Sequence, residues 1–149
     1  MNVDPATGEV RSTQDAWADL RARAEAHRHT SPETPEAIDA ELRAIEALGF
    51  EVADFYRVVL DEQYDAEKLF SAVKNRAIAK HSADRRPVAH VRALAEVDAA
   101  DAYGDWLNKK AVVKHVDATI QALRSKHIGL QSSLRGVQAM IGRAYGRTS

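Results

Sequence analysis

The most regular pattern in the chain lies in residues 113–141, which read VKHVDATIQALRSKHIGLQSSLRGVQAMI. Apolar residues recur there at alternating steps of three and four, the heptad period of a helix that packs along one seam. The seam residues are Val113, Val116, Ile120, Leu123, His127, Leu130, Leu134, Val137 and Ile141. His127 is the one polar member, and a polar residue in a seam commonly fixes the register of packing. A long amphipathic helix is therefore predicted here.

The chain before this segment predicts a second long helix. From Pro35 to about His81 apolar residues again recur every three or four positions, interrupted by Gly49 and Gln63. The sequence SADRRP at residues 82–87 is the only turn signal between the two periodic segments. Two long amphipathic helices joined by a short connection form an antiparallel hairpin. We therefore predict an all-α fold with long helices over 35–81 and 87–142, and a possible kink at Gly104.

The N-terminal part predicts one further, short helix. Ser12 with Asp15 three residues later resembles a capping box, which starts a helix that continues to about Arg28. Thr34 and Pro35 are suited to start the next helix as N-cap and first residue. Residues 1–11 offer nothing to bury, so a disordered tail is expected there. Residues 12–149 are predicted to form a single helical domain.

Two glycines inside the heptad segment predict close packing. An interior glycine costs a helix about 1 kcal/mol relative to alanine, and Gly129 and Gly136 lie one heptad apart beside the seam. Fraying is the alternative, and Gly142 and Gly146 fit it as C-cap and tail. A helix that is apolar on more than one side needs more than one partner. We therefore predict a homo-oligomer, a ring or bundle of several copies held through residues 107–142 by the nine seam residues with Gly129 and Gly136.

Composition and motifs exclude several classes of function. The 149 residues contain no cysteine, so disulfides and thiolate metal sites are absent. No apolar run is long enough for a membrane span, and the first residues lack the pattern of a signal peptide, so a cytoplasmic protein is expected. No phosphate-binding loop, GxSxG or HExxH motif occurs. Of the six histidines only His27 and His29 are close in sequence, and nothing near them supplies a third metal ligand. No enzyme activity, cofactor or metal site is predicted.

Charge is distributed unevenly along the chain. Residues 1–67 contain 16 acidic residues and 6 Lys or Arg, whereas residues 68–149 contain 6 acidic residues and 15 Lys or Arg. In one interpretation the two halves neutralise each other within the hairpin. In the other, the basic half binds a polyanion. Charge alone leaves both open.

The basic half holds two clusters that would bind phosphates with strong salt dependence and little sequence preference. The candidate DNA-binding residues are Lys68, Lys74, Arg76, Lys80, Arg85, Arg86, Lys109, Lys110, Lys114, Arg124 and Lys126. Four aromatic residues nearby could stack on bases, namely Phe70, Tyr103, Trp106 and Tyr145, although Phe70 and Trp106 fit a core position better.

This pattern resembles the UvsY-type recombination mediators of T4-like bacteriophages. The resemblance covers roughly residues 40–135 and rests on the aromatic pair Tyr103 and Trp106, on the run ALRSK at 122–126, and on the basic segment KLFSAVKNRAIAKHSADRR at 68–86. The family's acidic hairpin tip is replaced here by a short basic one.

The resemblance implies a non-enzymatic protein that binds single-stranded DNA as a ring-shaped oligomer. It would help to load a RecA-like recombinase onto strands covered by a single-strand binding protein, in the cytoplasm of a host bacterium. The alternative is a helical scaffolding protein of virion assembly that self-associates through its C-terminal heptads, with the acidic half of one copy against the basic half of the next.

Overall fold

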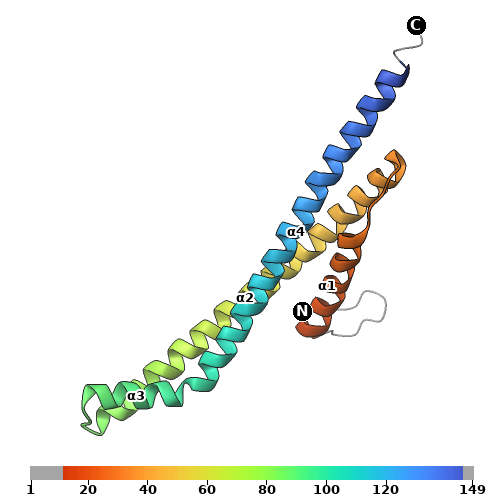
Figure 1. Cartoon of the computed structure of the whole chain (residues 1–149). Coiled ribbons are helices and arrows are strands. Elements are labelled where there is room, and N and C mark those ends of the chain that lie inside the picture. Colours follow the sequence, from red (N-terminus) through yellow and green to blue (C-terminus); the bar gives the residue numbers. More distant parts are fainter. Residues whose placement is uncertain (1–11, 146–149) are drawn as a thin grey trace. The chain divides into compact units, whose positions relative to one another are not determined.

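The computed structural model of the chain describes residues 12–145, so the tail expected at residues 1–11 lies outside the described part. Four helices follow one another: α1 (Thr13–His29), α2 (Pro35–Ala83), α3 (Val88–Asp98) and α4 (Ala100–Tyr145) (Figure 1). No strand occurs within residues 12–145. The prediction of an all-α fold, with a short N-terminal helix and a long hairpin, is confirmed.

Local side-chain chemistry explains where the first two helices begin. The Ser12 hydroxyl oxygen accepts a hydrogen bond from the Asp15 amide at 3.1 Å, and the Asp15 carboxylate accepts one from the Ser12 hydroxyl at 2.6 Å. This satisfies one of the free amides at the start of α1. The Thr34 hydroxyl accepts a hydrogen bond from the Ala37 amide at 3.2 Å, and Pro35 is the first residue of α2. Both starts match the sequence-based prediction.

The turn between α2 and α3 requires a left-handed backbone at one residue. Arg85 has a φ of 55°, a conformation uncommon for a residue with a side chain. Its amide donates to the Ser82 carbonyl at 3.2 Å, which closes the turn. Pro87 then precedes α3, and its carbonyl accepts hydrogen bonds from the amides of His90 and Val91.

The second arm of the hairpin is not one helix, as the prediction over residues 87–142 had it. The chain leaves helical geometry at Ala99, and α4 starts directly afterwards. Gly104, the position of the kink that the sequence suggests, lies inside α4. The interruption coincides with tight packing, because Ala95 and Ala99 are 0% and 1% exposed and neighbouring Asp98 contacts His81 of α2. Small side chains at these positions allow the backbones to lie close together.

Contacts divide the chain into two compact units. Unit 1 comprises Met1–Phe55 and Val116–Ser149, and unit 2 comprises Tyr56–His115. Helices α2 and α4 contribute a segment to each unit.

Unit 1 is built from α1, the first part of α2 and the second part of α4. Trp17 of α1 stacks on Phe55 of α2 with ring centroids 5.7 Å apart. The Arg23 guanidinium forms two hydrogen bonds of 2.6 and 2.7 Å to the Glu51 carboxylate, and His27 Nδ1 lies 2.9 Å from a carboxylate oxygen of Glu41. The buried apolar residues of this core are Ala16, Leu20, Ile38, Ile45, Leu48, Val52, Phe55, Val116, Leu123 and Leu130.

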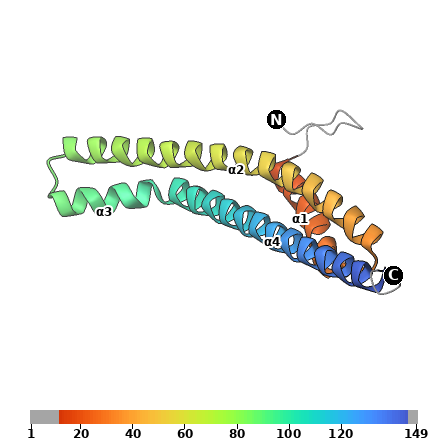
Figure 2. The same ribbon diagram turned by 90° about the horizontal axis from the view of Figure 1, so that it is seen from above.

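Unit 2 is a two-armed helical hairpin. The last part of α2 runs antiparallel to α3 and the start of α4 (Figure 2). Its buried residues are smaller than those of unit 1, namely Val59, Ala66, Ala77, His81, Val91, Ala95, Ala99 and Val113. Burial of small side chains removes little apolar surface from water, so this unit has the weaker core.

Candidate nucleic-acid interface

Three aromatic side chains meet between the arms of unit 2. Phe70 of α2 lies parallel to Trp106 of α4, with ring centroids 5.8 Å apart and an angle of 4° between the ring planes. Tyr103 is tilted against both rings, at 5.2 Å from Phe70 and 5.8 Å from Trp106. Tyr103 is 44% exposed. The cluster therefore contributes to the hairpin core and presents one ring to solvent.

Two lysines flank this aromatic cluster. The Lys74 ammonium lies over the Phe70 ring at 5.8 Å from its centroid, and the Lys110 ammonium lies over the Trp106 ring at 5.1 Å. A ring face attracts a cation without neutralising its charge. Within the described chain neither lysine forms an ion pair with a carboxylate. Both charges are thus held in place by rings and remain available to an anion. We call Phe70, Tyr103, Trp106, Lys74 and Lys110 the ring–lysine cluster.

Three other predicted DNA-binding residues are paired with acids of the same unit. Lys68 lies 3.4 Å from Asp65, and Arg86 lies 3.4 Å from Asp84. Lys109 donates to Glu62 across the hairpin at 2.7 Å, with both side chains about one-third exposed. A phosphate would have to compete with these carboxylates, so the three residues are weaker candidates than Lys74 and Lys110.

The remaining predicted cations of unit 2 are exposed. They are Arg76, Lys80, Arg85 and Lys114. None of the four forms an ion pair with another described residue. They add positive charge to unit 2, which also contains the ring–lysine cluster. Unit 2 therefore holds nine of the eleven residues predicted to bind DNA.

The other two predicted residues, Arg124 and Lys126, lie in unit 1. The Lys126 ammonium donates a hydrogen bond to the Thr30 carbonyl, at the end of α1. Arg124 is exposed on α4. The structure therefore does not bring all eleven cations into one compact unit.

His81 is buried in unit 2, although several of its neighbours in sequence are exposed basic residues. It is 8% exposed, and its Nε2 lies 2.9 Å from a carboxylate oxygen of Asp98. Its Nδ1 and the Trp106 Nε1 are buried without a hydrogen-bond partner among the described residues. The Asp98 contact joins residues 17 positions apart in sequence, so no local spacing could have revealed it.

The residues predicted to hold copies of the chain together are largely used inside one chain. Of the seam, Val113, Val116, Leu123 and Leu130 are buried, and Ile120, His127, Leu134 and Val137 are half-buried. Ile141 remains 44% exposed. A Cβ atom added at Gly129 or Gly136 would meet nothing within 4 Å. Close packing at these glycines therefore does not occur within the described chain, and a contact with another copy stays a prediction.

Two other kinds of feature are absent from the described part of the chain. No group of three or more His, Asp or Glu side chains within residues 12–145 is arranged to hold a metal ion. None of α1 to α4 is both long and apolar enough to cross a lipid bilayer.

Comparison with known proteins adds no relative. No protein-family model, no curated protein and no solved structure matches this chain.

Proposed function

We propose that this protein binds single-stranded DNA through the ring–lysine cluster and acts without catalysing a reaction. The observation that carries the proposal is the placement of Lys74 and Lys110 over Phe70 and Trp106, with no carboxylate partner in the described chain. Cations without a carboxylate partner can bind phosphates, and an exposed aromatic ring beside them can stack on a base, so the cluster suits a polymer of alternating phosphates and bases.

Preference for a single strand follows from Tyr103. Tyr103 is 44% exposed as a residue, and an exposed ring can stack on a base whose face is free. In a duplex the base faces are already stacked on one another, so only the phosphates could reach the lysines. We therefore assign Lys74 and Lys110 to phosphates and Tyr103 to a base.

The wider role that we propose is that of a recombination mediator. In this role several copies form a ring, and the ring helps to load a RecA-like recombinase onto single strands covered by a single-strand binding protein. This part rests on the heptad pattern at residues 113–141 and on the resemblance to UvsY-type mediators. Several weak DNA contacts would add up in such an assembly, because the second and later contacts form at high effective concentration.

The direct test measures anisotropy of a labelled oligo-dT strand across salt concentrations. The double variant Lys74→Glu/Lys110→Glu should weaken binding at least tenfold and reduce the slope of log affinity against log salt by about 1.4, because each phosphate that is no longer bound lowers the slope by about 0.7. Arg21→Glu/Arg43→Glu, an equal charge change on exposed residues of unit 1, is the matched control and should bind more tightly than the first variant.

The base contact has its own variants. Tyr103→Ala should weaken binding to oligo-dT by about 1–3 kcal/mol, whereas Tyr103→Phe, which keeps a ring, should retain the affinity. Far-UV circular dichroism checks that helix content is unchanged. Equal affinity of the lysine double variant and the wild type would overturn the assigned site, and equal affinity of Tyr103→Ala would overturn the base contact alone.

The second candidate function is a scaffolding protein. Unit 2 exposes several large apolar side chains, with Tyr64 50%, Leu69 56%, Val88 68% and Val97 73% exposed, and such surfaces often contact other proteins. In this function the acidic half of one copy packs against the basic half of the next, so salt should dissociate the assembly itself, and an oligonucleotide should leave its mass unchanged. Light scattering across salt, with and without oligo-dT, distinguishes the two functions.

A further inference from the structure

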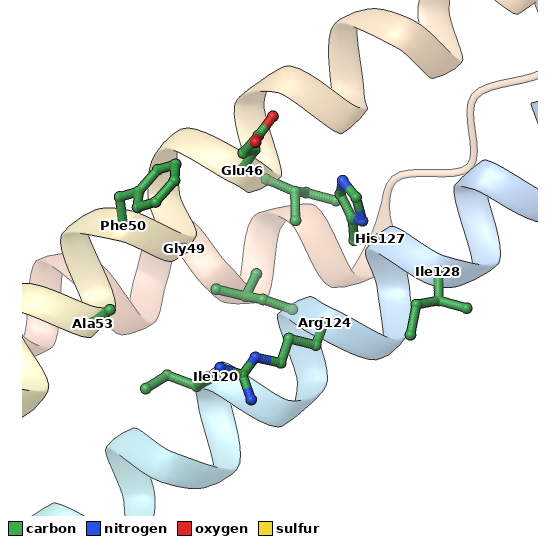
Figure 3. A pocket seen from close by; sticks show the side chains of 10 residues that line it. Glu46, Gly49, Phe50, Ala53, Ile120, Arg124, His127 and Ile128 are labelled. Carbon is green, nitrogen blue, oxygen red and sulfur yellow. The ribbon is translucent and has the colours of Figure 1, made fainter.

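An open groove lies between α2 and α4 within unit 1 (Figure 3). Its volume is about 390 Å³. Ile45, Gly49 and Ala53 line the α2 wall, and Ile120, Leu123 and His127 line the α4 wall. No residue of α1 contributes to the lining. The third helix of this unit therefore leaves the groove uncovered.

Two large apolar side chains border the groove and are mostly exposed. Phe50 on α2 is 67% exposed, and Ile128 on α4 is 62% exposed. Gly49 beside Phe50 has no side chain, and a Cβ added there would meet nothing within 4 Å. The groove is thus open, and apolar side chains form most of its lining and its border. Covering it would remove unfavourable apolar surface from water.

The groove also carries one charge of each sign, on opposite walls. Glu46 belongs to the α2 wall and Arg124 to the α4 wall (Figure 3). Neither side chain forms an ion pair with another residue in the described part of the chain. A partner that fits this groove should therefore present a positive group toward α2 and a negative group toward α4.

We infer that a second copy of this chain docks into the groove in a two-fold symmetric contact. In such a contact the same surface is used by both copies, so the surface must complement itself. With the two-fold axis along the groove, α2 of each copy lies over α4 of the other. Glu46 then faces the partner's Arg124 twice, and Phe50 lies over the partner's α4 wall.

Self-complementarity is the reason for choosing a second copy over a different protein. The same surface carries Glu46 and Arg124, which have opposite charges. It also carries both the exposed apolar side chains and the open groove that would receive them from another copy. The contact shares Ile120, Leu123 and His127 with the heptad seam and adds Phe50, Glu46 and Ile128, which are not seam residues. It also gives Arg124 a role in assembly and is independent of DNA binding by the ring–lysine cluster.

The experiment measures the mass of the full-length protein by size-exclusion chromatography with light scattering over a dilution series. Wild type should show at least twice the chain mass of 16.4 kDa, and Phe50→Asp should lower the measured mass and weaken association at least tenfold. Val58→Asp, at an apolar residue 37% exposed on the unit 2 part of α2, is the control and should leave the mass unchanged.

Charge reversal provides the decisive comparison. Glu46→Arg and Arg124→Glu should each weaken association, because each places like charges opposite one another. The double variant Glu46→Arg/Arg124→Glu should restore it, since the pairs form again with reversed sign. Circular dichroism confirms that each variant remains helical. A wild type that stays monomeric at high concentration overturns the inference, as does an assembly insensitive to Phe50→Asp or a double variant without recovery.

Discussion

At the scale of single residues, neighbouring lysines of unit 2 have different chemical environments. Lys109 donates to Glu62 across the hairpin, whereas Lys110, the next residue, lies over the Trp106 ring. One charge is compensated and the other is not. Successive residues of a helix point about 100° apart, so Lys109 reaches Glu62 on the facing helix, whereas Lys110 lies over Trp106, four residues earlier on its own helix. The value of a cation for binding phosphate is set by this orientation.

The ion pair between Arg23 and Glu51 leads to a pH-dependent prediction. Hydrogen bonds from the Arg23 guanidinium lower the pKa of the Glu51 carboxyl below its ordinary value. A lowered folded-state pKa stabilises the fold above the unfolded pKa, and this contribution is lost as the pH falls through the folded value. Both side chains are more than 40% exposed, so solvent screening limits the effect to about 0.2–1 kcal/mol.

Urea unfolding at several pH values measures this contribution. Glu51→Gln should be less stable than wild type at neutral pH, and the difference should shrink as the pH falls below about 4. Glu46→Gln removes a carboxylate that has no ion-pair partner among residues 12–145, and serves as the control at low protein concentration. A Glu51→Gln difference that is the same at pH 7 and pH 3 would contradict the assigned ion pair.

At the scale of elements, α4 contains glycines that its own chain does not require. Gly104, Gly129 and Gly136 all lie within the helix, and a Cβ at each would meet nothing within 4 Å. Glycine loses more backbone entropy than alanine when a helix forms. Inside a single chain these glycines only weaken α4. Close contact with the backbone of a second copy would be a physical reason for glycine at these positions.

Alanine substitution separates these two possibilities. Each of Gly104→Ala, Gly129→Ala and Gly136→Ala should raise the stability of the isolated chain by about 0.5–1 kcal/mol, measured by urea unfolding at low concentration. Gly104 is the internal control, because it lies outside the predicted strip of small residues. If Gly129→Ala and Gly136→Ala alone lower the assembled mass, they identify a close contact between helices of different copies. An unchanged mass removes that part of the oligomer prediction.

At the scale of the whole molecule, the two units have cores of different strength. Five apolar α2 residues of unit 1 are buried, each no more than 4% exposed, and they are Ile38, Ile45, Leu48, Val52 and Phe55. In unit 2, Ala66, Ala77, Ala95 and Ala99 supply half of the buried set. Because apolar burial stabilises in proportion to area, unit 2 should open more often than unit 1.

Hydrogen exchange measured by mass spectrometry tests this difference. Amides of α2 within residues 38–55 should exchange more slowly than amides of α2 within residues 59–83, although both belong to one helix. Oligo-dT should then slow exchange in the second segment if the ring–lysine cluster binds DNA. Equal protection along α2 without DNA would show that the helix opens as one unit.

Local physics made much of the fold predictable. The heptad period at residues 113–141, the capping residues Ser12 and Thr34 and the SADRRP turn act over a few positions, and they predicted the all-α hairpin and nearly every helix end. The interruption at Ala99 was missed because no proline or glycine marks it. It accompanies close packing of α3 on α2 and the Asp98 contact with His81, which depend on residues distant in sequence.

The sequence predicted which residues the candidate site contains, but not all of the partners that they meet. The sequence by itself determined that unit 2 carries many cations and that Phe70, Tyr103 and Trp106 are near them. Lys74, Lys110 and Lys68 contact residues three or four positions away in their own helices, a local spacing that the sequence also displays. Only the tertiary structure decided that Lys109 meets Glu62 across the hairpin, that the three aromatic rings contact one another, and that Phe50 borders an open groove. The physical reason is range. Helix formation and contacts between side chains three or four positions apart follow from neighbours along the chain, whereas contacts across the hairpin and apolar exposure depend on which side chains the facing helix brings opposite.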